Sequence, residues 1–304
     1  MAAIGASVAL AIGGLAACSS SEHDVVRSGA GAPVAANSPA EALKAAAQKT
    51  TEAGSAKVAM TFALTGLPGI GNATLNMEGA LDAANQQSSF TLDLSQLTSA
   101  LPASQQAGVS AILGSGKMQI VTDGGDVYLQ LGNLSTLLGA TTGQSWLKIS
   151  AGSDAASAVG APLGDGTEIL KLLDQAGGVE TVGTEQVRGV DTTHYRGNLD
   201  LASALAEASA DERAKAESEL GNVGIDPSSA SIPVDVWIGN DGLVRRVQVG
   251  VSGLEGAKAS GAGGTLTMEF FDFGQPVSIA IPPADQVFQV DPAMLGSLSK
   301  LAGG

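Results

Sequence analysis

Few side chains in this sequence have the chemistry of a catalytic centre. The 304 residues include two histidines, His23 and His194, and one cysteine, Cys18. His194 lies in a predicted strand with Thr192 and Arg196 on the same side, where an imidazole could act as a base. The sequence contains no Gly-x-Ser-x-Gly elbow and no Gly-rich phosphate loop of the Walker type. We therefore interpret His194 as a strand histidine bonded to a neighbour, predict no catalytic residue, and expect that the protein is not an enzyme.

Aspartates in or near predicted turns are the other candidates, as possible metal ligands. They are Asp123, Asp126, Asp235 and Asp241. Aspartate at a turn favours hydrogen bonds to the nearby backbone. Zinc sites use Cys and His ligands, and the region after residue 38 offers one His and no Cys. We predict no metal and no cofactor.

Cys18 has a different context, which suggests covalent modification. Residues 1–17 carry no charged side chain, and the apolar run from Ile4 to Leu15 is shorter than the roughly 20 residues of a membrane-spanning helix. This length is typical of the apolar part of a signal peptide. The run ends in Leu15-Ala16-Ala17-Cys18, which resembles a bacterial lipobox. The small residues would admit a peptidase, and the thiol would then carry a diacylglyceryl group with fatty acids such as palmitate.

We therefore predict a signal peptide over residues 1–17 and a lipidated, flexible tether over residues 18–38. The tether interpretation rests on its Ser, Gly, Ala and Pro content and its lack of apolar periodicity. The protein would be exported and lipid-anchored to the outer face of the bacterial cell membrane. Basic residues usually open a signal peptide, and none precedes Cys18. We accordingly expect a translation start upstream of Met1.

Composition limits the remaining classes. The formal net charge of −15 argues against a nucleic-acid partner, because phosphate recognition needs clustered Lys and Arg. Hydrophobic residues make up 44% of the chain and aromatic residues only 3%, so a core would be built from aliphatic side chains. A single cysteine excludes an internal disulfide.

The local patterns predict a helix over 39–53, introduced by Ser38-Pro39 and ended by Gly54. Strands with alternating apolar residues follow at 57–65, 73–82 and 88–94. Their apolar residues form our candidate cavity wall: Val58, Met60, Phe62, Leu64, Leu75, Met77, Phe90 and Leu92. Further strands are predicted at 117–132 (a hairpin), 145–149, 179–187, 190–198, 232–238, 243–251 and 265–273, with helices at 167–176 and 200–220 and a helix or flap within 95–116.

The helices fall between groups of strands instead of alternating with each strand. This order excludes a doubly wound parallel sheet and favours an α+β fold. We predict one large curved antiparallel sheet, a half-barrel, with helices packed across its concave face. Residues 39–304 would form a single domain.

Four segments in this order resemble the LppX/LprG-type bacterial lipoprotein family, which is related in fold to the carriers LolA and LolB. They are Ser-Trp-Leu-Lys at 145–148, Gly-Val-Asp-Thr-Thr-His-Tyr at 189–195, Pro-Val-Asp-Val-Trp-Ile at 233–238 continuing through Asp-Gly-Leu-Val-Arg-Arg at 241–246, and Phe-Asp-Phe-Gly at 271–274 ahead of Ile-Pro-Pro at 281–283. The resemblance extends over roughly residues 39–290. It implies an acyl-chain cavity under a curved sheet, and a role in moving or presenting lipids or glycolipids in the cell envelope.

Two functions remain open from the sequence. In the first, the protein is a lipid-anchored carrier that binds a lipid, a glycolipid or another hydrophobic molecule between sheet and helices. In the second, it is a non-catalytic envelope interaction or sensor module with a fully packed core and a protein partner. An apolar sheet face is required by both, so the pattern alone does not separate them.

Overall fold

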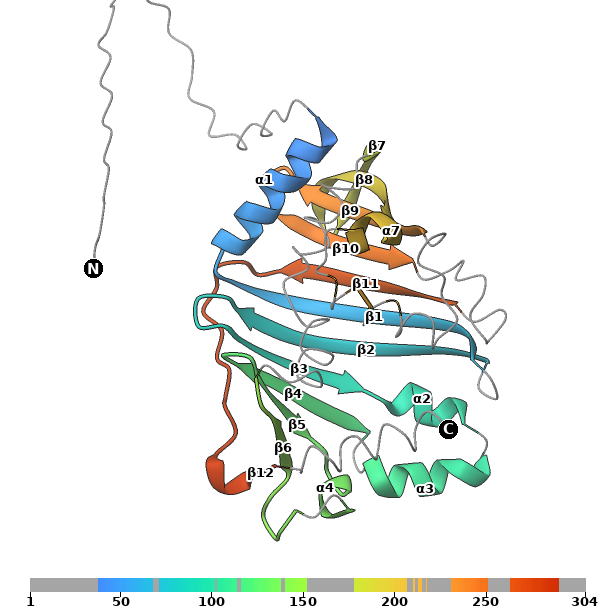
Figure 1. The fold of residues 1–304 in the computed structure, drawn as a ribbon, viewed down its shortest axis with the longest axis vertical. Helices are drawn as coiled ribbons and strands as arrows, with labels where there is room; N and C mark the ends of the chain where they lie inside the picture. The colour runs from blue at the N-terminus through green and yellow to red at the C-terminus, as the bar shows by residue number, and fades with distance from the viewer. Residues whose placement is uncertain are drawn as a thin grey trace, which may run out of the picture. The chain divides into compact units, whose positions relative to one another are not determined.

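In the computed structural model of the protein, the described residues are 38–67, 71–101, 103–113, 116–137, 140–151, 178–206, 210, 213–214, 217, 231–250 and 263–289. All belong to one of the two compact units into which the chain divides, Ala32–Gly304. They form an open sheet of 12 strands in the order β12-β6-β5-β4-β3-β2-β1-β11-β10-β9-β8-β7 (Figure 1). The strands turn progressively from β1 to β6, as the twist of a large sheet requires.

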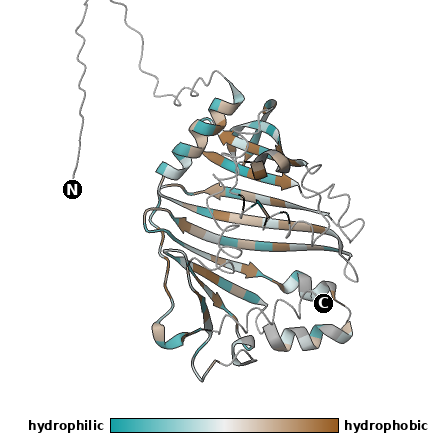
Figure 2. Ribbon diagram, in the orientation of Figure 1, coloured by the Kyte–Doolittle hydropathy of each residue, from teal (hydrophilic) through white to brown (hydrophobic). Residues whose placement is uncertain are grey.

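The strands correspond closely to the segments with period-two alternation. Their bounds are β1 Ser55–Leu67, β2 Gly71–Asp82, β3 Gln87–Asp93, β4 Lys117–Asp123, β5 Asp126–Gln130, β6 Trp146–Ile149, β7 Glu180–Val187, β8 Val190–Asp200, β9 Ser231–Gly239, β10 Val244–Gly250, β11 Gly263–Phe271 and β12 Val287–Gln289. Figure 2 shows apolar and polar residues alternating along β1 and β2. This alternation gives the sheet an apolar face and an opposite face, which we call the outer face.

The sheet is mixed, so the prediction of a purely antiparallel sheet is wrong at one edge. β12 pairs with β6 in the parallel direction, with Val287 opposite Trp146 and Phe288 opposite Leu147. After β11 the chain passes the ends of the neighbouring strands on its way to β12 (Figure 1). Ile279, Ile281 and Val287 of this segment pack against a small outer-face cluster of Val121, Tyr128 and Trp146. The apolar outer side of β4–β6 is therefore covered by the chain that supplies the parallel strand.

Helix α1, Pro39–Glu52, confirms the first predicted helix. Ser38 Oγ accepts a hydrogen bond from Glu41 N at 3.2 Å and caps the helix, and Pro39 occupies its first turn. Gly54, with φ of 76°, ends it in a conformation that glycine adopts readily. Leu43, Ala46 and Ala47 belong to the same buried cluster as the apolar face of the sheet. Helix α1 therefore packs on that face.

The remaining described helices are short. They are α2 Ser95–Ala100, α3 Ala103–Leu113, α4 Leu134–Leu137, α7 Leu201–Ala206 and the 3-10 helix Ala284–Gln286. Helices α2 and α3 confirm the helical alternative for 95–116. The predicted helix at 167–176 lies outside the described residues, and so does much of 200–220. Several helices across the concave face are not confirmed, whereas a large open sheet with few helices agrees with the predicted half-barrel.

Candidate functional site

The eight residues of the predicted wall lie on one face of β1, β2 and β3. The strand register places Met60 opposite Met77, and Met77 opposite Leu92. It also places Phe62 opposite Leu75, and Val58 opposite Gly79. Phe90 lies next to Gly79 on the other side, and Leu64 continues the β1 series. The structure therefore brings together on one face the residues that the alternation pattern groups.

Part of this face is tightly packed. Four residues in direct register on neighbouring strands, which we call the packed row, cross β10, β11, β1 and β2: Val247, Met268, Met60 and Met77. Their exposed fractions are 0%, 2%, 1% and 4%. They share one buried cluster with Leu43 of α1. The packed row is thus ordinary protein core.

The next row on the same face is only partly buried. Two residues further along each strand, about 7 Å away, lie four more apolar residues in register, the open row: Val249, Leu266, Phe62 and Leu75. All four are partly exposed. Leu92 and Met118, which are paired on β3 and β4, are also partly exposed. The open row therefore consists of aliphatic and aromatic side chains of the same kind as the core, but these side chains are partly exposed.

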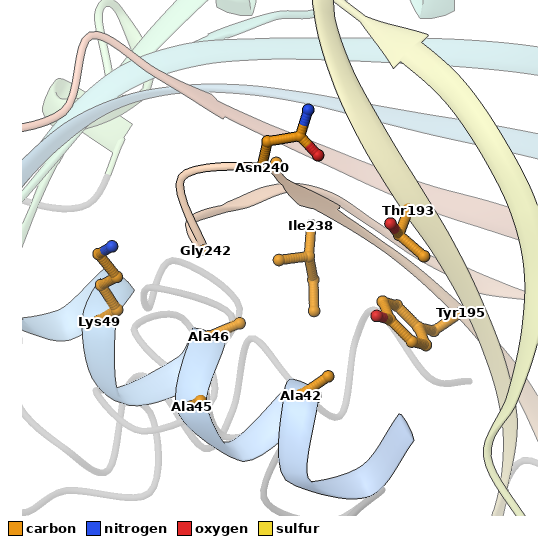
Figure 3. Close-up of a pocket in the computed structure, with 10 residues that line it drawn as sticks. Ala42, Ala45, Ala46, Lys49, Thr193, Tyr195, Ile238, Asn240 and Gly242 are labelled. Atoms are coloured by element: carbon orange, nitrogen blue, oxygen red, sulfur yellow. The ribbon is translucent and has the colours of Figure 1, made fainter. Parts of the chain in front are cut away.

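A small pocket lies between α1 and the β8–β9 part of the sheet. Ala42, Ala45 and Ala46 form its helical side, and Tyr195 and Ile238 point toward it from the sheet (Figure 3). Its volume is about 110 Å³, which is below the roughly 300–1,000 Å³ that sites for small molecules usually have. The small alanine side chains of α1 explain the gap, because they do not fill the space above the strands.

On the outer face, His194 is held by its neighbours. Its Nε2 lies 2.6 Å from Asp235 Oδ1, and its ring stacks on Trp237 with centroids 4.3 Å apart. Arg196 Nε donates to the same Asp235 oxygen at 2.8 Å. These contacts agree with a strand histidine bonded to a neighbour. Trp237 faces away from Val234, Val236 and Ile238, as its phase in the strand predicts, and its Nε1 donates to Glu185.

Two arginines converge on one carboxylate further along this face. Arg246 Nη2 donates to Glu269 Oε1 at 2.7 Å, and Arg188 Nε donates to Glu269 Oε2 at 2.8 Å. Burial raises the pKa of Glu269, but the bonds from Arg246 and Arg188 outweigh burial, so the net pKa lies below its ordinary value. Sequence analysis did not find this group, because Arg188 and Glu269 are 81 positions apart. The only local signal was the Arg188-Gly189 turn.

The four aspartates named as possible metal ligands form separate local interactions. Asp126 pairs with Lys148 at 2.6 Å, and Asp241 pairs with Arg245. Asp123 accepts from Gln87 at 2.9 Å, and Asp235 is bound as described above. Within the described ranges, no group of three or more His, Cys, Asp or Glu residues is placed to hold a metal ion. In the same ranges, no helix is both long and apolar enough to cross a membrane. Cys18 lies outside them.

The chain is similar to a 31.2 kDa protein of Streptomyces griseus, described as uncharacterised and as encoded in the rplA-rplJ intergenic region. The two are 31% identical over 228 residues, which cover 70% of this chain and 68% of the relative. No family model matches the chain.

Solved structures with a similar arrangement include the lipoproteins LppX of Mycobacterium tuberculosis and LprF of Mycobacterium bovis. LppX is 13% identical, with a TM-score of 0.44 over 80% of this chain and 100% of that one. LprF is 11% identical, with a TM-score of 0.43 over 84% and 100%. A LolA superfamily protein of Nitrosomonas europaea is 9% identical, with a TM-score of 0.27 over 80% and 93%. LppX is one of the two proteins that give their names to the family that the sequence motifs resemble.

Proposed function

This chain belongs to the family of the 31.2 kDa Streptomyces griseus protein, and we propose that it is an exported, membrane-anchored lipoprotein that binds a lipid or another hydrophobic molecule against the apolar face of its sheet. It would carry or present this ligand in the cell envelope without catalysing a reaction. Residues 39–304 would form one domain, and Cys18 would carry the lipid anchor.

The observation that carries this proposal is the open row. A core that was complete in itself would bury Phe62 and Leu266 as fully as their neighbours Met60 and Met268, which are 1% and 2% exposed. Covering apolar surface stabilises a complex by about 25 cal/mol per Å². An acyl chain has no directional bonding groups, so a wall of aliphatic and aromatic side chains suits it without polar partners.

Helices α2 and α3 are the elements that we propose to move when the ligand enters. Helix α2 begins two residues after Asp93, the last residue of β3, and therefore lies at the same end of the strand as Leu92 (Figure 1). Helix α1 packs instead against the row that is already closed. In this proposed arrangement, α1 would stay packed on the concave face. The segment 95–116, which holds α2 and α3, would open at the end where that face is partly exposed.

The anchor would keep this open face beside its lipid source. A flexible tether of about 20 residues has a root-mean-square length of roughly 25 Å, so the domain would stay near the membrane surface while remaining free to turn. Because Cys18 precedes the domain, lipid attached to it would not be bonded to any residue of the sheet. This part of the proposal rests on the lipobox-like sequence Leu15-Ala16-Ala17-Cys18.

Native mass spectrometry of the full chain carrying Cys18→Ala tests the ligand. The protein is extracted mildly from bacterial cells, and its mass is compared with that of the same protein after organic-solvent delipidation. We expect an acyl-lipid adduct that is lost on delipidation and restored by adding palmitate. Absence of an adduct, together with no affinity for palmitate, would replace this proposal with the interaction module that has a packed core.

A further inference from the structure

A second recess lies on the outer face, on the side of the sheet opposite the open row. It has a volume of about 380 Å³, within the roughly 300–1,000 Å³ typical of small-molecule sites. Its floor crosses β2, β1 and β11, and Arg188 from the β7–β8 turn overhangs it. Because side chains alternate between faces, Met60 and Met77 border this recess with their backbone, and polar residues line it.

The floor is an array of two registered rows on three strands. In the first row Ala59 lies between Glu78 and Glu269. In the second row Thr61 lies between Asn76 and Thr267. The methyl group of Ala59 is the smallest side chain in the array, so a shallow groove forms between the two carboxylates. Thr61 Oγ1 donates to Asn76 Oδ1 at 3.2 Å, which leaves the Asn76 amide N–H groups for another acceptor.

Arg188 is presented by an unusual turn. Arg188 has φ of 50° and Gly189 has φ of 79°, the positive pair of a type I′ hairpin turn, whose first position normally favours Asn, Asp or Gly. Arg188 nevertheless occupies it and lies over the ring of Phe271, 4.1 Å from the centroid. Among the residues that the structure describes, its hydrogen-bond partner is Glu269, which takes one of its five N–H groups. The others are available to a molecule in the groove.

The charges in and beside the groove cancel. Glu78 and Glu269 contribute two negative charges, and Arg188 and Arg246 contribute two positive charges. Glu269 is bound by both arginines, whereas Glu78 is exposed and makes no ion pair within the part of the chain that the structure describes. A simple anion or cation would not match such a neutral set. A ligand with many hydroxyl groups would, because each hydroxyl both donates and accepts a hydrogen bond.

We propose that this groove binds the sugar rings of a carbohydrate, with Glu78 accepting from hydroxyl groups and Arg188 and Asn76 donating to them. The sugar is either a free glycan or the headgroup of a glycolipid. The site is independent of the open row, since the two lie on opposite faces of the sheet. One molecule could therefore hold a lipid and a glycan at the same time.

Saturation-transfer NMR of the full chain tests this site. The probes are methyl glycosides of glucose, mannose, galactose and N-acetylglucosamine, and phosphatidylcholine vesicles with and without a glucosylated diacylglycerol. The variants are Glu78→Ala, which removes an exposed acceptor, and Arg188→Asn, which removes the guanidinium while keeping a residue that suits the turn. Ser89→Ala, on the outer face but outside the groove, is the matched control.

We expect at least one of these sugar-bearing probes, a glycoside or the vesicle with the glucosylated lipid, to bind the wild-type chain. Glu78→Ala and Arg188→Asn should each weaken that binding at least tenfold, and Ser89→Ala should leave it unchanged. Binding restricted to vesicles with the glucosylated lipid identifies a headgroup ligand, and binding to soluble glycosides identifies a free glycan. The proposal is overturned if no probe binds, or if bound probes do not distinguish the two groove variants from Ser89→Ala.

Discussion

Thr50 of α1 and Val244 of β10, 194 residues apart in the chain, are joined by a buried hydrogen bond in which Val244 N donates to Thr50 Oγ1 at 3.0 Å. Val244 is the first residue of β10, and the pairing of β10 with β9 shifts register directly after it. A threonine in the last turn of α1 thus satisfies a backbone group at a bulge of the sheet. This contact attaches the C-terminal end of α1 to β10, next to the buried part of the apolar face.

We predict that Thr50→Val lowers the free energy of unfolding by about 1–3 kcal/mol, because the shape is kept while a buried N–H loses its acceptor. Urea denaturation measures the change. Thr51→Val is the control: Thr51 is exposed, and its hydroxyl donates to Ala47 O within the helix. If Thr51→Val lowers the free energy of unfolding as much as Thr50→Val does, the hydrogen bond between α1 and β10 does not have this role.

Gly79 makes room for the ring of Phe90 on the neighbouring strand. A methyl group at this position would lie 2.4 Å from Phe90 Cδ1 and 2.2 Å from the backbone oxygen of Ser89. We predict that Gly79→Ala destabilises the protein by about 1–3 kcal/mol, as expected for overpacking. Gly183→Ala in β7 is the control, since no atom lies within 4 Å of its added carbon. Thermal unfolding of both variants tests this prediction. If Gly79→Ala and Gly183→Ala have equal melting temperatures, position 79 does not lie this close to Phe90 and Ser89.

Glu269 gives folding a defined acid dependence. Its pKa in the folded protein lies below the ordinary value of 4.5, so its contribution is complete above that value and is lost as the pH falls through the lower folded pKa. We predict that Glu269→Gln is less stable than wild type by about 1–3 kcal/mol at pH 7, and that the difference narrows below about pH 4. Urea denaturation of both proteins, from pH 7 to below about pH 4, measures this difference in the free energy of unfolding. Glu78→Gln should show no comparable difference, and a gap for Glu269→Gln that is constant with pH would contradict the assignment.

The sequence predicts those parts of the fold that depend on local rules. Neighbouring residues determine three features that the structure confirms: the cap at Ser38, the end of α1 at Gly54 and the alternation in β1–β3. The parallel edge strand β12 was missed because prolines such as Pro282 indicate the end of pairing, whereas here they precede a new strand.

The difference between the two rows of the apolar face could not be predicted either. Phe62 and Met60 have the same phase in β1 and similar hydropathy, and only the elements packed above them make one partly exposed and the other buried. The outer-face groove depends on the register of β1, β2 and β11 and on a turn that brings Arg188 to Glu269. Pairings at such separation follow from tertiary structure and leave no spacing in the sequence.

For the anchor, we predict that Cys18→Ala releases the protein from the membrane or leaves it as an unprocessed precursor. The thiol is the acceptor of the proposed lipid, and no other cysteine is present to replace it. Membrane fractionation and the mass of the mature protein measure the outcome. Ser20→Ala, within the proposed tether, should remain anchored. A Cys18→Ala protein that is still mature and still needs detergent for extraction would show that the anchor is elsewhere.

The most informative substitutions place the same carboxylate in the two rows of the apolar face. Met77 is 4% exposed and belongs to the packed row, so Met77→Asp buries an unpaired charge, and we predict a loss of several kcal/mol. Phe62 belongs to the open row and is partly exposed. Phe62→Asp can therefore keep its charge hydrated and should leave the protein folded.

If the open row is where the ligand lies, Phe62→Asp should fold with near-wild-type circular dichroism and lose the acyl-lipid adduct seen by native mass spectrometry. Phe62→Leu, which keeps an apolar side chain at the same place, should retain it. The comparison separates binding from stability because the two Phe62 variants differ in polarity at one position. A Phe62→Asp protein that unfolds as completely as Met77→Asp would show that the open row is closed core in solution, and one that folds and keeps the adduct would place the ligand elsewhere.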